Sequence, residues 1–236
     1  ARKQNQRKII DINGKTYNFD VDGYVTTGIH ALYDDWTSMM RAEMNVWEFD
    51  SNGVLIDQIT EKGVIDNKRG DLYLIEDDGF VHGGSASGHL TRYEGEYYFV
   101  LYSGKLLTNA SRWVGTAQTN GLLPADVYYF GEDGKLFTGV REDADGFLYY
   151  YKDGKVAVGL YNSELAEING SVYIIKWSGK VATDETRFVP GSLTNGLVSA
   201  DTYYFGKDGK LFTGIKEGTD GFLYYYKDGK VAVGLY

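Results

Sequence analysis

Short apolar runs rich in tyrosine alternate along this chain with turns that contain glycine, and this pattern predicts β-hairpins. Each unit has an aromatic triplet, a turn ending in Asp-Gly-Lys, a short apolar run and a glycine; one example runs from Tyr128 to Gly139. Aromatic residues favour the pleated surface of a strand, and Asp-Gly between two such runs favours a tight reversal. The expected strands of this example are Tyr-Tyr-Phe before the turn and Lys-Leu-Phe-Thr after it. Successive side chains point to opposite faces of a strand, so both faces of each triplet carry aromatic rings.

The hairpin pattern recurs with a fixed internal period. Residues 121–161 and 196–236 are identical at 33 of 41 aligned positions, 75 residues apart. The spacing between successive turn glycines follows the order 30, 20 and 25 from Gly104 onward, and a more divergent first copy precedes it. The nine turn glycines are Gly23, Gly53, Gly79, Gly104, Gly134, Gly154, Gly179, Gly209 and Gly229.

A single hairpin is marginally stable in water, and stacking the next hairpin on it buries its apolar face. The sequence therefore predicts an all-β solenoid of stacked hairpins with a 75-residue super-repeat of three hairpins. We expect a basic N-terminal arm over 1–11 and one repeat domain over 12–236, with super-repeats of about 12–92, 93–167 and 168–236.

One stretch departs from the hairpin pattern. Residues 29–46 contain no glycine, and Trp36, Met39, Met40 and Met44 follow one another at helix-like spacing. This spacing predicts a short helix or an irregular loop in place of an ordinary connector.

Composition and charge narrow the class of protein. The net charge of −9 disfavours nucleic acid as a partner, and no apolar run reaches the ~18 residues of a membrane span. The 236-residue chain has no cysteine, so it has neither disulfides nor thiolate metal sites. Because it begins Ala-Arg-Lys-Gln without methionine, we expect a fragment of a longer protein.

No catalytic or metal site is predicted. His30, His82 and His89 do not have metal-site spacing. Asp20 and Asp143 each begin a stretch that resembles the start of a calcium loop, but position twelve holds Ala31 or Gly154 where a glutamate is required. We therefore expect no enzymatic activity, no metal and no cofactor.

The motif Tyr-Tyr-Phe-x-x-Asp-Gly-Lys-x-x-x-Gly resembles the cell-wall-binding repeats of Gram-positive surface proteins. These include pneumococcal choline-binding repeats, glucan-binding repeats of streptococcal glucosyltransferases and the repetitive domains of clostridial toxins. The resemblance covers most of 12–236 and is strongest over 97–236. It implies a β-solenoid that binds carbohydrate or cell-wall polysaccharide without catalysis, on an extracellular or cell-wall-associated protein.

Choline is not an expected ligand. Choline-binding repeats carry Gly-Trp after the hairpin, and the tryptophan helps to form an aromatic cage for the quaternary ammonium. In this sequence an aliphatic residue replaces that tryptophan. The dipeptides are Gly28-Ile29, Gly139-Val140, Gly159-Leu160, Gly214-Ile215 and Gly234-Leu235.

Candidate ligand residues lie in two long segments, Leu106 to Asp126 and its copy 75 residues later. Sugar rings have apolar C–H faces that stack on aromatic rings, while their hydroxyls need polar or charged partners. The candidates are Arg112, Trp113, Asn120 and Asp126, with Arg187, Phe188, Asn195 and Asp201 as their copies; Trp36 and Arg41 supply a possible third site. The alternative is that Trp113 and Phe188 only cap a wider turn of the core.

Two other functions remain open from the sequence. The repeats could form a structural stalk or adhesin spacer that presents another domain. They could also be the repeat portion of a larger secreted enzyme or toxin.

Overall fold

The computed structural model describes residues 9–20, 22–34, 36–83, 87–157 and 163–232. Most of the predicted basic arm, with Arg2, Lys3, Arg7 and Lys8, therefore lies outside the described residues. The chain divides into two compact units, Ala1–Leu136 and Phe137–Tyr236, and each is described by itself.

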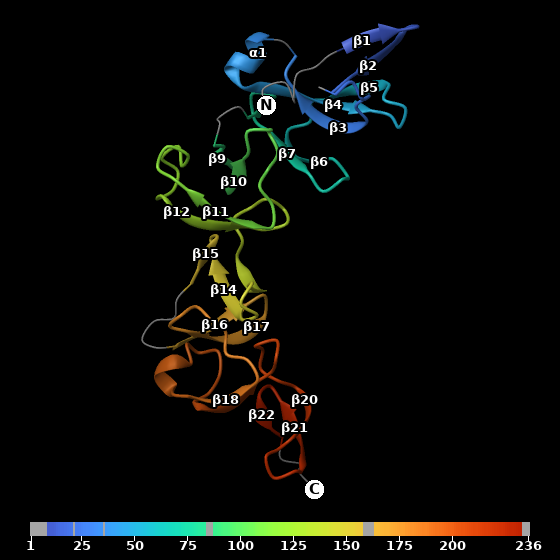
Figure 1. Cartoon of the computed structure of the whole chain (residues 1–236). Helices are drawn as coiled ribbons and strands as arrows, with labels where there is room; N and C mark the ends of the chain where they lie inside the picture. Colours follow the sequence, from blue (N-terminus) through green and yellow to red (C-terminus); the bar gives the residue numbers. More distant parts are fainter. Residues whose placement is uncertain (1–8, 21, 35, 84–86, 158–162, 233–236) are drawn as a thin grey trace. The chain divides into compact units, whose positions relative to one another are not determined.

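The first unit is built almost entirely of strands (Figure 1). A β4-centred sheet contains β3, β4, β5 and β8, and the remaining strands form two-stranded hairpins. The elements are β1 (Ile9–Ile12), β2 (Lys15–Asn18), β3 (Gly28–Leu32), α1 (Trp36–Arg41), β4 (Glu43–Phe49), β5 (Leu55–Ile59), β6 (Gly63–Asp66), β7 (Leu72–Ile75), β8 (Val81–His82), β9 (His89–Tyr93), β10 (Glu96–Val100), β11 (Ala110–Val114) and β12 (Asp126–Phe130).

The second unit alternates three-stranded and two-stranded antiparallel sheets. The three-stranded ones are β13–β14–β15 and β20–β21–β22, and the hairpins β16–β17 and β18–β19 are two-stranded. The elements are β13 (Gly139–Glu142), β14 (Leu148–Lys152), β15 (Lys155–Val156), β16 (Ser163–Ile168), β17 (Ser171–Lys176), β18 (Glu185–Val189), the 3-10 helix η2 (Gly191–Leu193), β19 (Asp201–Phe205), β20 (Gly214–Glu217), β21 (Leu223–Lys227) and β22 (Lys230–Val231). The all-β prediction is confirmed.

The predicted turn glycines adopt the backbone conformation that the pattern requires. All nine have positive φ, between 77° and 90°, which a glycine tolerates because it has no Cβ. The turn at Gly134 is representative: the amide of Gly131 donates to the carbonyl of Lys135 at 2.8 Å and closes a three-residue loop.

The strand expected after this turn is much shorter than predicted. Phe130 pairs with Leu136 only through an isolated bridge, and the main partner of β12 is the preceding strand β11. The amide of Leu136 instead donates to the carbonyl of Tyr97 at 3.2 Å, and Lys135 bridges Tyr98. The residues after the turn thus divide their backbone hydrogen bonds between their own hairpin and the preceding one.

The aromatic triplets form the core, as predicted. Tyr128, Tyr129 and Phe130 are all buried, and the Phe130 ring lies 6.0 Å from that of Phe99 in the preceding hairpin. Phe205, which corresponds to Phe130 in the later copy, is also fully buried. Both faces of each triplet are used, so each hairpin contributes rings to more than one contact.

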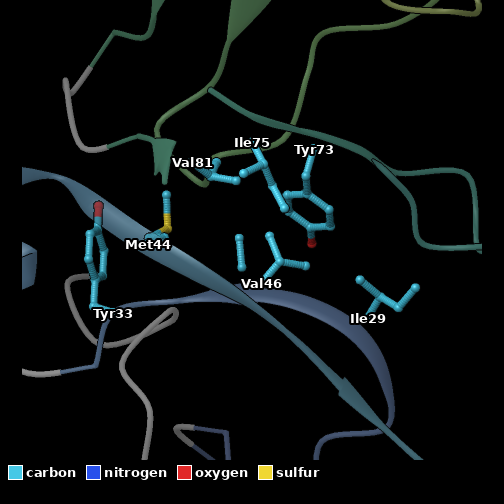
Figure 2. Close-up of a cluster of buried hydrophobic side chains, with 8 residues drawn as sticks. Ile29, Tyr33, Met44, Val46, Tyr73, Ile75 and Val81 are labelled. Atoms are coloured by element: carbon cyan, nitrogen blue, oxygen red, sulfur yellow. The ribbon is translucent and has the colours of Figure 1, made fainter. Parts of the chain in front are cut away.

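The segment 29–46 contains a helix of only six residues, α1, between β3 and β4. Met39 packs against the core beside it, and Met40 is exposed. Met44 lies in β4 rather than in the helix and is fully buried near Val81 (Figure 2). The helical spacing therefore correctly located α1 but extended it into the next strand.

Two histidines of the first unit give a testable pH dependence. Burial lowers the pKa of both His30 and His89 from the ordinary value of 6.5, and the Arg69 and Lys105 cations lower that of His30 further. Between the folded and unfolded pKa values the unfolded chain binds more protons, so stability is complete above about pH 6.5 and falls as the pH drops below it. Urea unfolding at about pH 7.5 and about pH 5.5 should show this loss.

The variant His30→Gln isolates the histidine contribution. Burial raises the pKa of Glu76 in the same unit, which acts in the opposite sense at lower pH. We therefore compare the wild type with the variant at each pH, and the variant should lose less stability on acidification. An identical loss in both proteins would contradict a neutral, buried His30.

Candidate functional site

The hairpin β11–β12 places Trp113 on an exposed face. Trp113 pairs across the hairpin with Val127, and their side chains are 60% and 49% exposed. The indole therefore does not cap the core of its own unit, and with Val127 it forms an apolar platform open to solvent.

Arg112 lies on the opposite face of the same hairpin. Neighbouring side chains in a strand alternate, and Arg112 pairs with the buried Tyr128. Its guanidinium lies 4.7 Å from the Phe99 ring centroid and donates to the carbonyl of Ser87 at 2.7 Å. Arg112 thus covers the core, and the structure does not bring it together with Trp113.

The asparagines of the long segments bind backbone. Asn120 and its copy Asn195 both adopt positive φ, and their amide groups donate to the carbonyls of Leu90 and Leu165 at 3.0 and 3.1 Å. Each asparagine fastens its long segment to the preceding hairpin. Asp126 accepts a hydrogen bond from the amide of Val127 at 2.7 Å, on the face of Arg112.

The hairpin β18–β19 repeats this geometry with the same register. Ala110 pairs with Phe130 in the first copy and Glu185 with Phe205 in the second, each 75 residues on. Phe188 occupies the place of Trp113, is 66% exposed and pairs with the exposed Thr202.

The charged residues of this second copy have partners of their own. Arg187 lies 3.5 Å from Glu185, and Asp201 forms a 2.6 Å ion pair with Lys230. The hydrogen bond from Lys230 holds the pKa of Asp201 below its ordinary value. As in the first copy, the aromatic residue and the predicted carboxylate lie on opposite faces.

The third candidate pair lies in α1. Trp36 is the first residue of that helix, and its side chain lies outside the described residues. Arg41 is the last residue of α1, and its guanidinium lies 4.0 Å from the carboxylate of Glu43.

The second unit also contains an aromatic hollow that sequence reasoning missed. A hollow of about 740 Å³ is lined by residues between Asp184 and Lys216, among them Tyr204, Phe212 and Ile215. The Tyr204 and Phe212 rings lie 5.4 Å apart in an edge-to-face arrangement, and the Tyr226 ring completes a trio at 5.5 and 5.9 Å. Tyr204 was interpreted as core only; its burial fits that, but one side of it borders the hollow.

A charged pair borders this trio. The hydroxyl of Tyr204 donates to Asp184, and this hydrogen bond lowers the pKa of the carboxyl. The Lys216 ammonium lies 3.6 Å from Asp184 and 4.5 Å from the Tyr204 ring centroid. The hydrogen bond with Tyr204 raises the pKa of Lys216. The chain thus places its own cation over an aromatic ring of the hollow.

Two further searches bear on the class of site. Within the part of the chain that the structure describes, no group of three or more histidine or carboxylate side chains is placed to hold a metal ion. Over the same residues, no helix combines the length and apolar character needed to cross a membrane.

Comparison with known proteins places the chain beside two streptococcal enzymes. It is 25% identical over 237 residues to Glucosyltransferase-S of Streptococcus mutans, which covers 94% of this chain and 14% of that protein. It is 26% identical over 206 residues to Glucosyltransferase-I of Streptococcus downei, covering 79% of this chain and 12% of that protein. The chain therefore spans only a small part of the length of these relatives. No family model matches it.

Among solved structures, the chain is similar to two pneumococcal proteins. CbpJ from Streptococcus pneumoniae TIGR4 is 19% identical, with 96% of this chain and 88% of that chain covered and a TM-score of 0.34. Choline binding protein F from Streptococcus pneumoniae is 21% identical, with 96% and 87% covered and a TM-score of 0.33.

Proposed function

We propose that the chain is a non-catalytic repeat module that binds a glycan, either a glucan or a cell-wall polysaccharide, through the exposed aromatic rings of its long hairpins. The observation that carries the proposal is the equivalent placement of Trp113 and Phe188, 60% and 66% exposed on the same face of two hairpins with the same register. Large rings left in water at corresponding places are unnecessary for a core and are typical of binding surfaces.

The physical match is with a sugar ring. One face of a pyranose presents C–H groups, which pack on an indole or a phenyl ring. Val127 beside Trp113 widens the apolar platform, and Thr202 beside Phe188 offers a hydroxyl to a sugar hydroxyl. The two curated relatives are named as glucosyltransferases, which favours a polymer of glucose as the first ligand to test.

The repeat architecture fits this function. We infer that the hairpins form a solenoid with a 75-residue super-repeat, which would present equivalent platforms periodically to a polymer. Each platform alone binds weakly, and a polymer that engages both gains by effective concentration. The module would belong to an extracellular or cell-wall-associated protein.

The first prediction concerns the two platforms. Removing one ring by Trp113→Ala or Phe188→Ala should weaken retention on an immobilised glucose polymer, and the double variant should weaken it at least tenfold more than either single variant. Affinity electrophoresis in gels containing the polymer measures this effect. A short glucose oligosaccharide should bind each single variant at half the stoichiometry of the wild type.

Trp177→Ala is the matched control, because Trp177 is 69% exposed but lies at the end of a turn and not on a long hairpin. It should bind like the wild type. A folded double variant that binds the glucose polymer undiminished would contradict the proposal and favour the stalk alternative. Loss of binding in the control as well would point to a diffuse aromatic surface.

The second prediction concerns choline. The aliphatic residues Val140 and Ile215 follow Gly139 and Gly214, and the Lys216 ammonium already lies over the Tyr204 ring. Gly159-Leu160 and Gly234-Leu235 lie, at least in part, outside the described residues. We expect no retention of the protein on a column that carries choline at physiological salt. Elution of bound protein by free choline would contradict this expectation.

A further inference from the structure

The last hairpin that the structure describes has an uncovered apolar face. In β20–β22, the side chains of Ile215, Leu223 and Tyr225 are 67%, 73% and 50% exposed. Their neighbours Phe222 and Val231 are 69% and 44% exposed. We call Ile215, Leu223 and Tyr225 the C-face.

An earlier copy of the C-face is covered. The residues 75 positions before it are Val140, Leu148 and Tyr150 in β13–β14, and all three pack against the next hairpin, β16–β17. From that hairpin Ile168, Tyr173, Ile175 and Val181 take part, and each is at most 8% exposed.

Backbone and charged contacts also join these two hairpins. The amide of Tyr150 donates to the carbonyl of Gly179 at 3.1 Å, and the amide of Val181 donates to the carbonyl of Leu148 at 2.8 Å. Lys180 lies 3.2 Å from Asp145 and 3.3 Å from the centroid of the Phe147 ring. This contact therefore shows what kind of element the C-face accommodates.

The first described hairpin is of the same kind as β16–β17. Ile12-Asn13-Gly14 corresponds to Ile168-Asn169-Gly170, 156 residues apart, and Tyr17 and Val25 correspond to Tyr173 and Val181. The registers agree: Ile12 pairs with Lys15 as Ile168 pairs with Ser171, and Phe19 bridges Val25 as Ile175 bridges Val181.

On this first hairpin the matching face is uncovered. Ile12 and Val25 are 45% and 39% exposed, and Tyr17 and Phe19 are half-buried. We call Ile12, Tyr17, Phe19 and Val25 the N-face. Asn18, on the other face, is buried and bonded to Thr26, so the uncovered side is the one that β16–β17 uses for stacking.

The turn glycine supports the same correspondence. A Cβ added to Gly179 would lie 2.2 Å from a methyl group of Val156, so that valine fills the space beside the glycine. At Gly23, the equivalent on the first hairpin, nothing lies within 4 Å. Val231, which corresponds to Val156, is 44% exposed. The N-face has an unfilled space, and the C-face has the side chain that fills it.

We propose that the C-face of one molecule binds the N-face of a second copy of this chain, head to tail. The contact would reproduce the β13–β15 on β16–β17 stacking between molecules. Tyr24, 73% exposed, would take the place of Lys180 against Phe222. Because the two surfaces differ, the contact is heterologous, and each molecule keeps one face for a further copy.

Sedimentation velocity over a range of protein concentrations tests this proposal with two single variants. Leu223→Glu introduces a charge into the C-face, and Ile12→Glu introduces one into the N-face; both side chains are exposed in the isolated chain, so the fold should persist. The average mass of the wild type should rise with concentration. Each variant alone should stay at the monomer mass.

An equimolar mixture of the two variants is the decisive arm. Leu223→Glu retains an intact N-face and Ile12→Glu retains an intact C-face, so the mixture should form a dimer and nothing larger. The matched control is Ile56→Glu, because Ile56 is 58% exposed in β5 and belongs to neither face; it should associate like the wild type.

Three outcomes would overturn the proposal. The wild type could remain monomeric at every concentration, which would leave these faces to hairpins of other origin. Ile12→Glu could associate as strongly as the wild type, which would indicate symmetric contact between two C-faces. The mixture could stay monomeric while the wild type associates, which would place the contact elsewhere.

Discussion

Burial of one hairpin's apolar face by the next hairpin is the interaction on which the rest of this structure depends. An isolated hairpin exposes both faces and is marginal in water. In the second unit, Val140, Leu148 and Tyr150 gain cover from β16–β17, while the matching residues of β20–β22 stay exposed. The difference arises from the neighbour alone, because the sequences of the two hairpins are nearly identical over this region. Stability is therefore a property of contacts between repeats, as in other repeat proteins.

This constraint determines which side chains remain for binding. The aromatic triplets are used in stacking on both faces, so they offer little to a ligand, apart from the side of Tyr204 at the hollow. The long segments are held by Asn120 and Asn195 on backbone carbonyls of the preceding hairpin. Their strands then present Trp113 and Phe188 outward. A rigid core and periodic exposed rings follow from the same arrangement.

The sequence predicted the features that depend on local chemistry. The turn glycines, the buried triplets and the equivalence of Trp113 with Phe188 follow from residue type and spacing. The sequence did not reveal features that depend on the neighbouring hairpin. The strand after Gly134 shortens because its backbone bonds to Tyr97. Arg112 covers Phe99, and Tyr204, Phe212 and Tyr226 meet only after folding. Neither contact has a signature in the period of the repeat.

Native-state hydrogen exchange at matched amides tests the stacking most directly, at a concentration low enough to keep the chain monomeric. The amide of Tyr150 bonds to the carbonyl of Gly179 in the next hairpin. Tyr225 is the same residue in the same strand 75 positions later, and none of the described residues covers its face with a following hairpin. The account predicts strong protection of Tyr150 and fast exchange of Tyr225. Equal protection of both amides would show that each hairpin is stable by itself, and would contradict the dependence on its neighbour.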